Sequence, residues 1–305
     1  MRTFTLKGLF LTAVFMVLGC LAIHAADGDL ITKQITIKLE EAGTLPSKIG
    51  DTKKYKITNL KIMGEINGTD LRFIRKMAGC NEEGRRTEGE LATLDLSGSK
   101  IVKGGDIYFY SSYFYCYTSD DVIGAYAFYG CSSLTSLTLP SNVTKIGESA
   151  FEGCSGLTSL TLPSSVTEIG AYAFYGCSSL ASLTLPSSVT SIGSSAFYGC
   201  SGLTSIYVSW ESPLSIDAYT FKDANTEKCI LYVPKGTYDD YWLSNWGIFA
   251  NIVEYDATGI DHITTSGEAK EISRYAADGQ RLEVPAKGLN IVKYSDGSVK
   301  KVVVQ

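Results

Sequence analysis

The segment that decides the fold runs from Ile123 to Pro140 and reads IGAYAFYGCSSLTSLTLP. Its opening Ile-Gly pair and its cysteine both return three times, always after a step of 23 residues. A fixed step of about 20–29 residues that carries Leu-x-x-Leu-x-Leu is typical of a leucine-rich repeat solenoid. The repeated positions are Ile146, Ile169 and Ile192 for the pair, and Cys154, Cys177 and Cys200 for Cys131.

A single unit has too few apolar residues to offset the conformational entropy of its backbone, so the units must stack and share a core. Side chains alternate along a strand, which directs Leu137 and Leu139 inward and Ser136 and Thr138 outward. Pro140 lacks an N–H and is expected to end its strand. The sequence therefore predicts a solenoid of short parallel strands with a 23-residue period.

The pattern Ile-Gly-x-x-Ala-Phe-x-x-Cys-x-x-Leu-x-x-Leu-x-Leu-Pro resembles the BspA-like leucine-rich repeat proteins of bacterial surfaces. The resemblance covers about residues 91–254. It implies a curved solenoid with an adhesive or ligand-binding role, placed outside the cell or on the outer surface of a bacterium. It implies no catalytic residues.

Residues 1–26 are typical of a secretory signal peptide, with Arg2 and Lys7 before an apolar core and Ala25-Ala26 at its end. Two alternatives remain open. The core could anchor the chain in the membrane, although it is short for a span. The sequence before Cys20 is similar to a lipobox, which would place a lipid anchor on that cysteine. The favoured mature form has no transmembrane span.

Residues 27–90 do not repeat and are expected to form an α+β cap on the N-terminal end of the solenoid. Alternating apolar residues predict a strand over 35–39 and another near 55–62. The spacing of apolar residues from Leu71 to Ala78 predicts a helix, with Thr69 or Asp70 as its N-cap.

An insertion at about residues 97–122 interrupts the solenoid of residues 91–254. It is dense in aromatic residues, which can either form a recognition surface or pack over one edge of the solenoid. Both readings stay open. The candidate binding residues in this insertion are Tyr108, Tyr110, Tyr113 and Tyr115.

The C-terminal part of the chain changes character in two steps. Leu231 to Pro234 is predicted to be the last solenoid strand, after which Tyr238, Tyr241, Trp242 and Trp246 close the core. Residues 255–305 are predicted to be a linker and a small all-β module, because Asp-Gly pairs separate alternating apolar runs. The run from Arg274 to Val304 resembles the C-terminal sorting domains of the type IX secretion system; the alternative is a β module that only ends the chain.

Charge and composition narrow the function classes. The chain has a net charge of −5, and removal of Arg2 and Lys7 with the leader makes it −7. This acidity argues against nucleic acid as a partner. His24 lies in the leader and His262 in the predicted linker, so Ser-His, Cys-His and His-metal arrangements are disfavoured. We expect no metal, no cofactor and no enzyme activity, with a carboxylate-pair glycosidase as the enzyme alternative.

Cys131, Cys154, Cys177 and Cys200 occupy one equivalent position per unit. Equivalent positions on neighbouring strands lie about 4.8 Å apart with parallel Cα–Cβ bonds, whereas a disulfide needs converging Cβ atoms about 3.8 Å apart. These four cysteines are therefore predicted to be free, buried thiols. A bond between two of the other cysteines, Cys80, Cys116 and Cys229, stays open.

The strand face that points away from the core is the predicted binding surface, for an extracellular protein or a glycan. Its hydroxyls can donate and accept hydrogen bonds. The alternatives are that these hydroxyls only keep the strands soluble, and that the protein is a structural component of a surface assembly. The predicted face comprises Thr93, Asp95, Ser136, Thr138, Ser159, Thr161, Ser182, Thr184, Ser205, Tyr207 and Tyr232.

Overall fold

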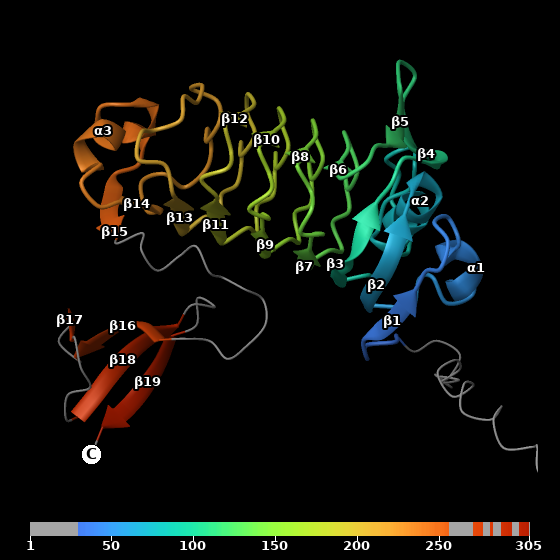
Figure 1. The fold of residues 1–305 in the computed structure, drawn as a ribbon, viewed down its shortest axis with the longest axis horizontal. Coiled ribbons are helices and arrows are strands. Elements are labelled where there is room, and N and C mark those ends of the chain that lie inside the picture. The colour runs from blue at the N-terminus through green and yellow to red at the C-terminus, as the bar shows by residue number, and fades with distance from the viewer. Residues whose placement is uncertain (1–29, 256–270, 277–280, 283–287, 295–298, 305) are drawn as a thin grey trace, which may run out of the picture.

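A computed structural model describes residues 30–255, 271–276, 281–282, 288–294 and 299–304. The predicted leader, Cys20 and His262 lie outside the described residues. The predicted class is confirmed: the chain forms a repeat solenoid with a small helical part at its N-terminal end (Figure 1). No helix in the described ranges is both long and apolar enough to cross a bilayer.

One nine-stranded sheet runs along the whole solenoid, and every pairing in it is parallel. The strands of the repeats are only three or four residues long because each coil must turn away after its inward leucines. In spatial order the sheet contains β1 (Ile35–Lys38), β2 (Asn59–Ile66), β3 (Thr93–Ile101), β7 (Ser136–Thr138), β9 (Ser159–Thr161), β11 (Ser182–Leu185), β13 (Ser205–Val208), β14 (Ile230–Pro234) and β15 (Asn251–Tyr255).

A second parallel ladder lies across the core from the first and is built from two-residue strands. It consists of the Ile-Gly segments of successive coils, which pair in register. The interior isoleucines of this ladder are buried, and Lys145 forms an ion pair with Glu168 across it at 2.7 Å. Its strands are β6 (Val122–Ile123), β8 (Lys145–Ile146), β10 (Glu168–Ile169) and β12 (Ser191–Ile192).

The core repeats as regularly as the sequence. Phe128, Phe151, Phe174, Phe197 and Phe221 stack in one column, with ring centroids 5.1–5.4 Å apart. This spacing is close to the distance between neighbouring strands, so each ring lies directly on the next. The column ties every coil to its neighbours through buried apolar contacts.

The cysteines at the repeated position form a second column. Cys131, Cys154, Cys177 and Cys200 are buried and free. From the second coil on, each Sγ donates to the carbonyl of the phenylalanine one coil earlier, for example Cys154 to Phe128 at 3.0 Å. The remaining described cysteines, Cys80, Cys116 and Cys229, are also free, so no disulfide joins them.

The glycine of each Ile-Gly pair is required by close contact between coils. A Cβ on Gly170 would lie 2.6 Å from the backbone nitrogen of Glu148, and one on Gly193 would lie 2.3 Å from that of Ala171. Any side chain here would push the coils apart. The last coil carries Asp217 at this position, where the regular period ends.

The N-terminal part is joined to the solenoid by the sheet itself, because β1 and β2 extend it beyond β3. Two helices follow in this part: α2 (Gly68–Met77) packs against β2, and α1 (Leu45–Ile49) packs against α2. The expected helix is present, but the predicted N-cap is wrong: Asn67 caps α2, and Asp70 completes a capping box with the backbone of Asn67.

Two side chains, Arg75 from this part and Tyr108 from the insertion, replace a missing coil at the N-terminal end. In the interior coils, backbone N–H groups donate to the next coil, as Phe128 does to Ala150 at 2.7 Å. The equivalent carbonyl of the first coil, Ala127, has no coil before it. Arg75, which is fully buried, donates to this carbonyl at 3.0 Å and to that of Tyr129 at 3.2 Å.

The third such carbonyl of the first coil, that of Ala125, accepts a hydrogen bond from the hydroxyl of Tyr108 at 2.8 Å. Arg75 also donates to the carbonyls of Tyr126 and Asn81, and its guanidinium lies 5.0 Å from the ring of Phe109. Arg75 and Tyr108 therefore satisfy buried backbone acceptors that would otherwise lose their partners.

The insertion forms an antiparallel hairpin of β4 (Gly104–Tyr110) and β5 (Tyr115–Thr118). The base of the hairpin is buried at Tyr108, Phe109 and Cys116, and it packs against α2. The tip projects away from the solenoid on the side of the second ladder (Figure 1). The packing reading therefore holds for the base of the insertion, and the tip is exposed.

The C-terminal end of the solenoid is closed by α3 (Tyr238–Trp242) and a short 3₁₀ helix, η1 (Asn245–Ile248). Tyr241 and Trp246 are fully buried there. The prediction that Tyr238 and Trp242 also close the core is wrong, because they are 42% and 51% exposed. The prediction that Leu231 to Pro234 is the last strand is also wrong, since β15 pairs with it in parallel.

The described C-terminal residues form a separate four-stranded antiparallel sheet with the order β17-β16-β18-β19. Its strands are β16 (Glu271–Ala276), β17 (Arg281–Leu282), β18 (Gly288–Tyr294) and β19 (Val299–Val304).

Replacement of Arg75 by Met should lower the free energy of unfolding by about 2–5 kcal/mol, because several buried carbonyls lose their donors at once. The matched control is Arg86→Met, the same chemical change at an exposed position, which should change stability by about 0.5 kcal/mol or less. Denaturant unfolding measures both variants. Equal stability of Arg75→Met and the wild type would contradict the capping role.

The cysteine column should be inert in the native state. Burial raises the pKa of Cys131 and of Cys200 to about 12, from an ordinary value of 9.0. Because the unfolded thiols ionise first, the thiol contribution to stability should be complete below pH 9 and should fall as pH rises from 9 toward 12. Melting temperatures across this range, and alkylation at pH 8 before and after denaturation without reductant, test this expectation. Fast native alkylation, or any bridged pair found by mass spectrometry, would contradict it.

Candidate functional site

The outward side chains of the nine-stranded sheet form two straight rows, which we call the strand face. The strand register aligns the predicted hydroxyl residues of successive coils side by side. The first row contains Thr36, Lys61, Asp95, Thr138, Thr161, Thr184, Tyr207, Tyr232 and Val253. The second row contains Asn59, Thr93, Ser136, Ser159, Ser182, Ser205, Ile230 and Asn251.

The middle of the strand face is lined by serine and threonine. Thr161, Ser159 and Ser182 are exposed, while Thr138 and Thr184 are half-buried by their neighbours. Only one hydrogen bond joins two of the face hydroxyls within the described part of the chain, from Ser205 to Ser182 at 3.1 Å. The serine and threonine hydroxyls of the strand face can both donate and accept hydrogen bonds.

Aromatic rings stand at the C-terminal end of the strand face. Tyr207 and Tyr232 are half-buried and stack almost in parallel, with centroids 4.3 Å apart and an interplanar angle of 3°. Tyr255 meets Tyr207 edge-on at 6.2 Å, and its hydroxyl donates to the carbonyl of Val208 at 2.8 Å. The sequence alone did not point to Tyr255, because the strand that carries it lies beyond the recognisable repeat.

A charged pair marks the other end of the strand face. Lys61 on β2 and Asp95 on β3 form an ion pair at 2.7 Å. Partial burial alone would raise the pKa of Asp95, but hydrogen bonds from Lys61 and Ser97 lower it below its usual value. The strand face thus changes from charged, through hydroxyl-rich, to aromatic along the solenoid.

The hairpin tip is a second and separate exposed surface. Tyr113 is 94% exposed and Tyr115 is 64% exposed. Phe114 stacks on Tyr126 of the first coil with centroids 5.0 Å apart. The hairpin projects from the solenoid on the side opposite the strand face (Figure 1). Tyr110 is half-buried and forms a hydrogen bond with Glu83.

The prediction that Tyr108 belongs to a binding surface is wrong. Its side chain is 1% exposed, and its hydroxyl is used to close the first coil. Burial also raises its pKa well above the ordinary value. The sequence could not separate Tyr108 from the exposed tyrosines of the hairpin, since all lie within one aromatic run.

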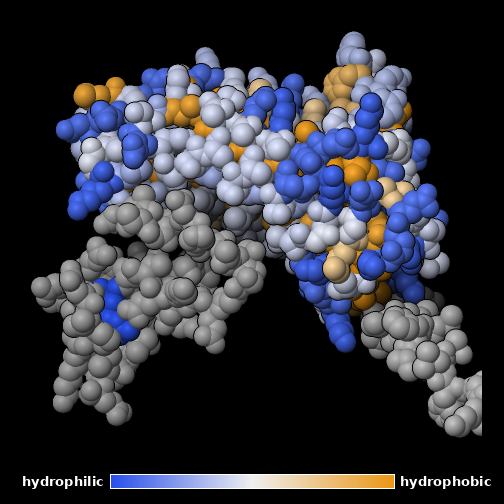
Figure 2. All heavy atoms as spheres, in the orientation of Figure 1, coloured by the Kyte–Doolittle hydropathy of each residue, from blue (hydrophilic) through white to orange (hydrophobic). Residues whose placement is uncertain are grey.

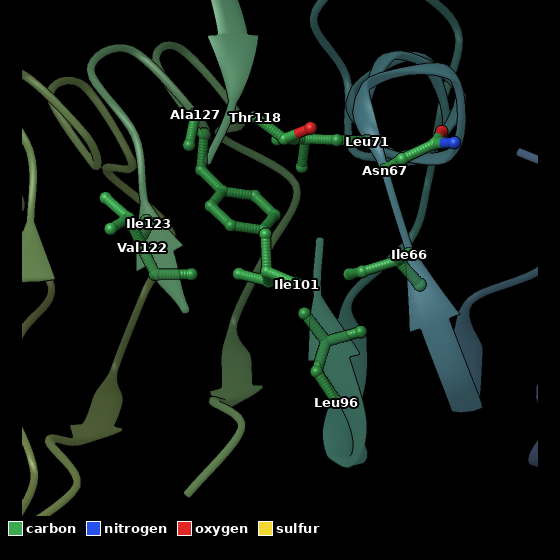
Figure 3. Close-up of a pocket in the computed structure, with 10 residues that line it drawn as sticks. Ile66, Asn67, Leu71, Leu96, Ile101, Thr118, Val122, Ile123 and Ala127 are labelled. Atoms are coloured by element: carbon green, nitrogen blue, oxygen red, sulfur yellow. The ribbon is translucent and has the colours of Figure 1, made fainter. Parts of the chain in front are cut away.

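One cavity in the described residues, of about 10 Å³, lies between the N-terminal part and the first coil (Figure 3). This volume holds at most one water molecule. Its walls are mainly apolar and include Ile66, Leu71, Leu96, Ile123 and Phe128. The cavity is a packing gap at the junction.

Metal-binding groups do not converge in the described ranges: no three His, Cys, Asp or Glu side chains come close enough there to hold an ion. The candidate surfaces are the strand face and the hairpin tip, which carry exposed hydroxyls and exposed aromatic rings.

Comparisons with known proteins support the repeat architecture. Residues 121–241 match the family model of the BspA type Leucine rich repeat region, in six copies. No match was found among curated proteins.

Several solved structures are similar in part to this chain. A leucine rich repeat protein of T. pallidum is 33% identical, with a TM-score of 0.36, over 44% of this chain and 62% of that one. A leucine-rich repeat protein from Bacteroides ovatus is 26% identical, with a TM-score of 0.34, over 67% and 42%. The pneumococcal vaccine antigen PcpA is 17% identical, with a TM-score of 0.38, over 73% and 68%. The alignment thus spans less than two thirds of the first two proteins.

The 23-residue step, the buried phenylalanine and cysteine columns and the family match all concern the same segment. Residues 121–241 therefore form a BspA type leucine-rich repeat region.

Proposed function

We propose that this protein is a secreted or surface-displayed binding protein, and that its strand face holds an extracellular protein or glycan. The observation that carries the proposal is the stacked pair Tyr207 and Tyr232, which lies beside the serine and threonine hydroxyls of the strand face. In the coils immediately before it, the residue aligned with Tyr207 in the strand register is a threonine. The aromatic pair is therefore a departure from the repeat.

Such a pair suits an anchor for a ligand. Tyrosine offers a large contact area with little conformational entropy to lose, and its hydroxyl adds a hydrogen bond. The surrounding hydroxyls can orient a bound ligand through hydrogen bonds, and they cost less to desolvate than charged groups. The shallow face favours a large partner, whose affinity would be concentrated in a few aromatic contacts.

The choice between a protein and a glycan is made by experiment. The purified chain is tested on arrays of extracellular matrix proteins and of glycans. Binding without turnover supports the proposal. Hydrolysis of a glycan on the array would instead favour the alternative, a carbohydrate-active enzyme, and absence of binding on both arrays would favour a structural component of a surface assembly.

For a ligand found on the arrays, the double change Tyr207→Ala and Tyr232→Ala should weaken binding by about 2 kcal/mol or more, a loss of about thirtyfold. The matched control is Tyr219→Ala, which removes an exposed tyrosine from a turn outside the strand face. Isothermal titration calorimetry measures both, after circular dichroism has shown an intact fold. An equal effect of the two changes would argue against the stacked pair as the anchor.

The hairpin tip is tested separately, because it lies on the other side of the solenoid. Replacement of Tyr113 and Tyr115 by Ser leaves the buried base of the hairpin in place. If the strand face is the binding surface, this variant should bind like the wild type. A loss of about 2 kcal/mol in the tip variant, with none in the strand-face variant, would move the site to the hairpin.

We further propose that residues from about 268 to 305 direct export, on the resemblance to type IX sorting domains. The described strands of this part pair only with one another, in a sheet separate from that of the solenoid. A chain that ends at Asp256 should therefore keep the melting temperature of the solenoid and lose surface display. Antibody labelling of intact cells measures the display. If the shortened chain is still displayed, the sorting role is contradicted.

A further inference from the structure

The nine-stranded sheet has two outer edges that match each other. In the described part of the chain, β1 pairs only with β2, and β15 pairs only with β14. All strands between them run in the same direction. Because a parallel sheet has the same direction at both edges, the β1 edge of one copy can continue the β15 edge of another without a reversal.

The inward row of the sheet also ends in the same way on both sides. Its interior members are fully or almost fully buried, whereas Ile35 on β1 and Ile252 on β15 are only half-buried, since each has a neighbouring strand on one side. A second copy that places its Ile35 beside Ile252 would cover both side chains and extend the apolar row. The whole row is Ile35, Leu60, Leu94, Leu137, Leu160, Leu183, Ile206, Leu231 and Ile252.

The backbone at both edges has groups directed outward. The N–H of Leu39 donates to Met63 on β2 at 2.8 Å, so the alternation along β1 directs the N–H and C=O of Thr36 and Lys38 away from β2. In the same way, the carbonyl of Tyr255 accepts from Lys235 beside β14, which directs those of Ile252 and Glu254 outward. These are the groups that an added parallel strand would bond.

The two ends carry opposite charge. Residues 30–58 contain six lysines and three acidic residues, a net charge of +3, whereas residues 226–255 contain two lysines and four acidic residues, a net charge of −2. The end that carries α3 also exposes large apolar side chains, Trp242 at 51% and Leu243 at 83%. Figure 2 shows orange surface at this end of the solenoid. Opposite charges favour contact between unlike ends and disfavour contact between like ends.

We propose that copies of this chain associate head to tail, with β15 of one copy paired in parallel with β1 of the next. Such a contact joins two different surfaces, so it leaves a free edge at each end of the assembly and allows further copies to add. A contact between two β15 edges related by a two-fold axis would be antiparallel and would bring two acidic ends together.

The test is sedimentation velocity of residues 27–305 over a rising series of concentrations. The average mass should increase with concentration beyond that of two chains, and added salt should reduce it, since the ends attract by charge. A mass that stays at one chain throughout would overturn the proposal.

Two variants block one end each. Thr36→Pro removes an outward N–H of β1 at an exposed edge position, where proline is tolerated. Ile252→Lys places a charge on the inward row at the β15 edge. Each variant alone should sediment as a single chain, and an equal mixture should form pairs and nothing larger, because each variant keeps the end that the other lacks. Association of Thr36→Pro alone would overturn the head-to-tail arrangement.

Charge variants provide a second test of the proposal, because they change residues outside the two edge strands. Asp240→Lys at the acidic end should weaken association, and Lys33→Glu on the partner end should restore it in mixtures of the two. The matched control is Glu148→Lys, an exposed change of the same charge in the middle of the solenoid, which should associate like the wild type. Equal weakening by Glu148→Lys would show that net charge, and not the ends, controls the association.

Discussion

The structure depends on hydrogen bonds that run from one coil to the next. A coil of 23 residues has strands of two to four residues and cannot satisfy its own backbone groups. The N–H of each phenylalanine in the core column therefore donates to the following coil, at 2.7 Å for Phe128, Phe151 and Phe174. This arrangement is stable in the middle of the solenoid and costly at its ends, where carbonyls would be buried without donors. The guanidinium of Arg75 on α2 and the hydroxyl of Tyr108 on β4 remove this cost, because they bond the same three carbonyls that a preceding coil would bond.

The same constraint separates structural from variable positions. Inward leucines, the glycine after each isoleucine and the buried cysteine are fixed by contacts between coils, so they repeat. Outward positions on the strand face make no contact with the core, so the fold does not fix which residue stands there. Departures from the repeat on this face are therefore informative. They make its two ends chemically different, with the ion pair of Lys61 and Asp95 at one end and the stacked rings of Tyr207 and Tyr232 at the other.

Much of the fold could be predicted from the sequence, because in a solenoid residues one repeat apart occupy equivalent places on neighbouring coils. A step of 23 residues placed Leu137 and its equivalents inward and the cysteines in one column, where the structure has them. The two-residue strands of the second ladder carry no alternation of their own, so their pairing could not be predicted. The carbonyls that Arg75 caps, those of Ala127 and Tyr129, lie 52 and 54 residues away in sequence, beyond any local pattern. Asn67 rather than Thr69 caps α2 because Asp70 completes the capping box from inside the helix.

The strand-face residues could be predicted as a set, because alternation and register determine which side chains share a side. The exposure of individual tyrosines could not. Tyr108 and Tyr113 belong to one aromatic run, but the packing of the hairpin base on α2 buries the first, while the turn exposes the second.

The central claim is that the first coil is held as firmly as the coils behind it, because side chains take the place of a missing coil. Hydrogen-exchange mass spectrometry of the native chain measures this directly. We expect the amides around Phe128 in the first coil to be as strongly protected as those around Phe174 in the third. Protection that falls steadily toward the first coil would show a frayed end and would contradict the account.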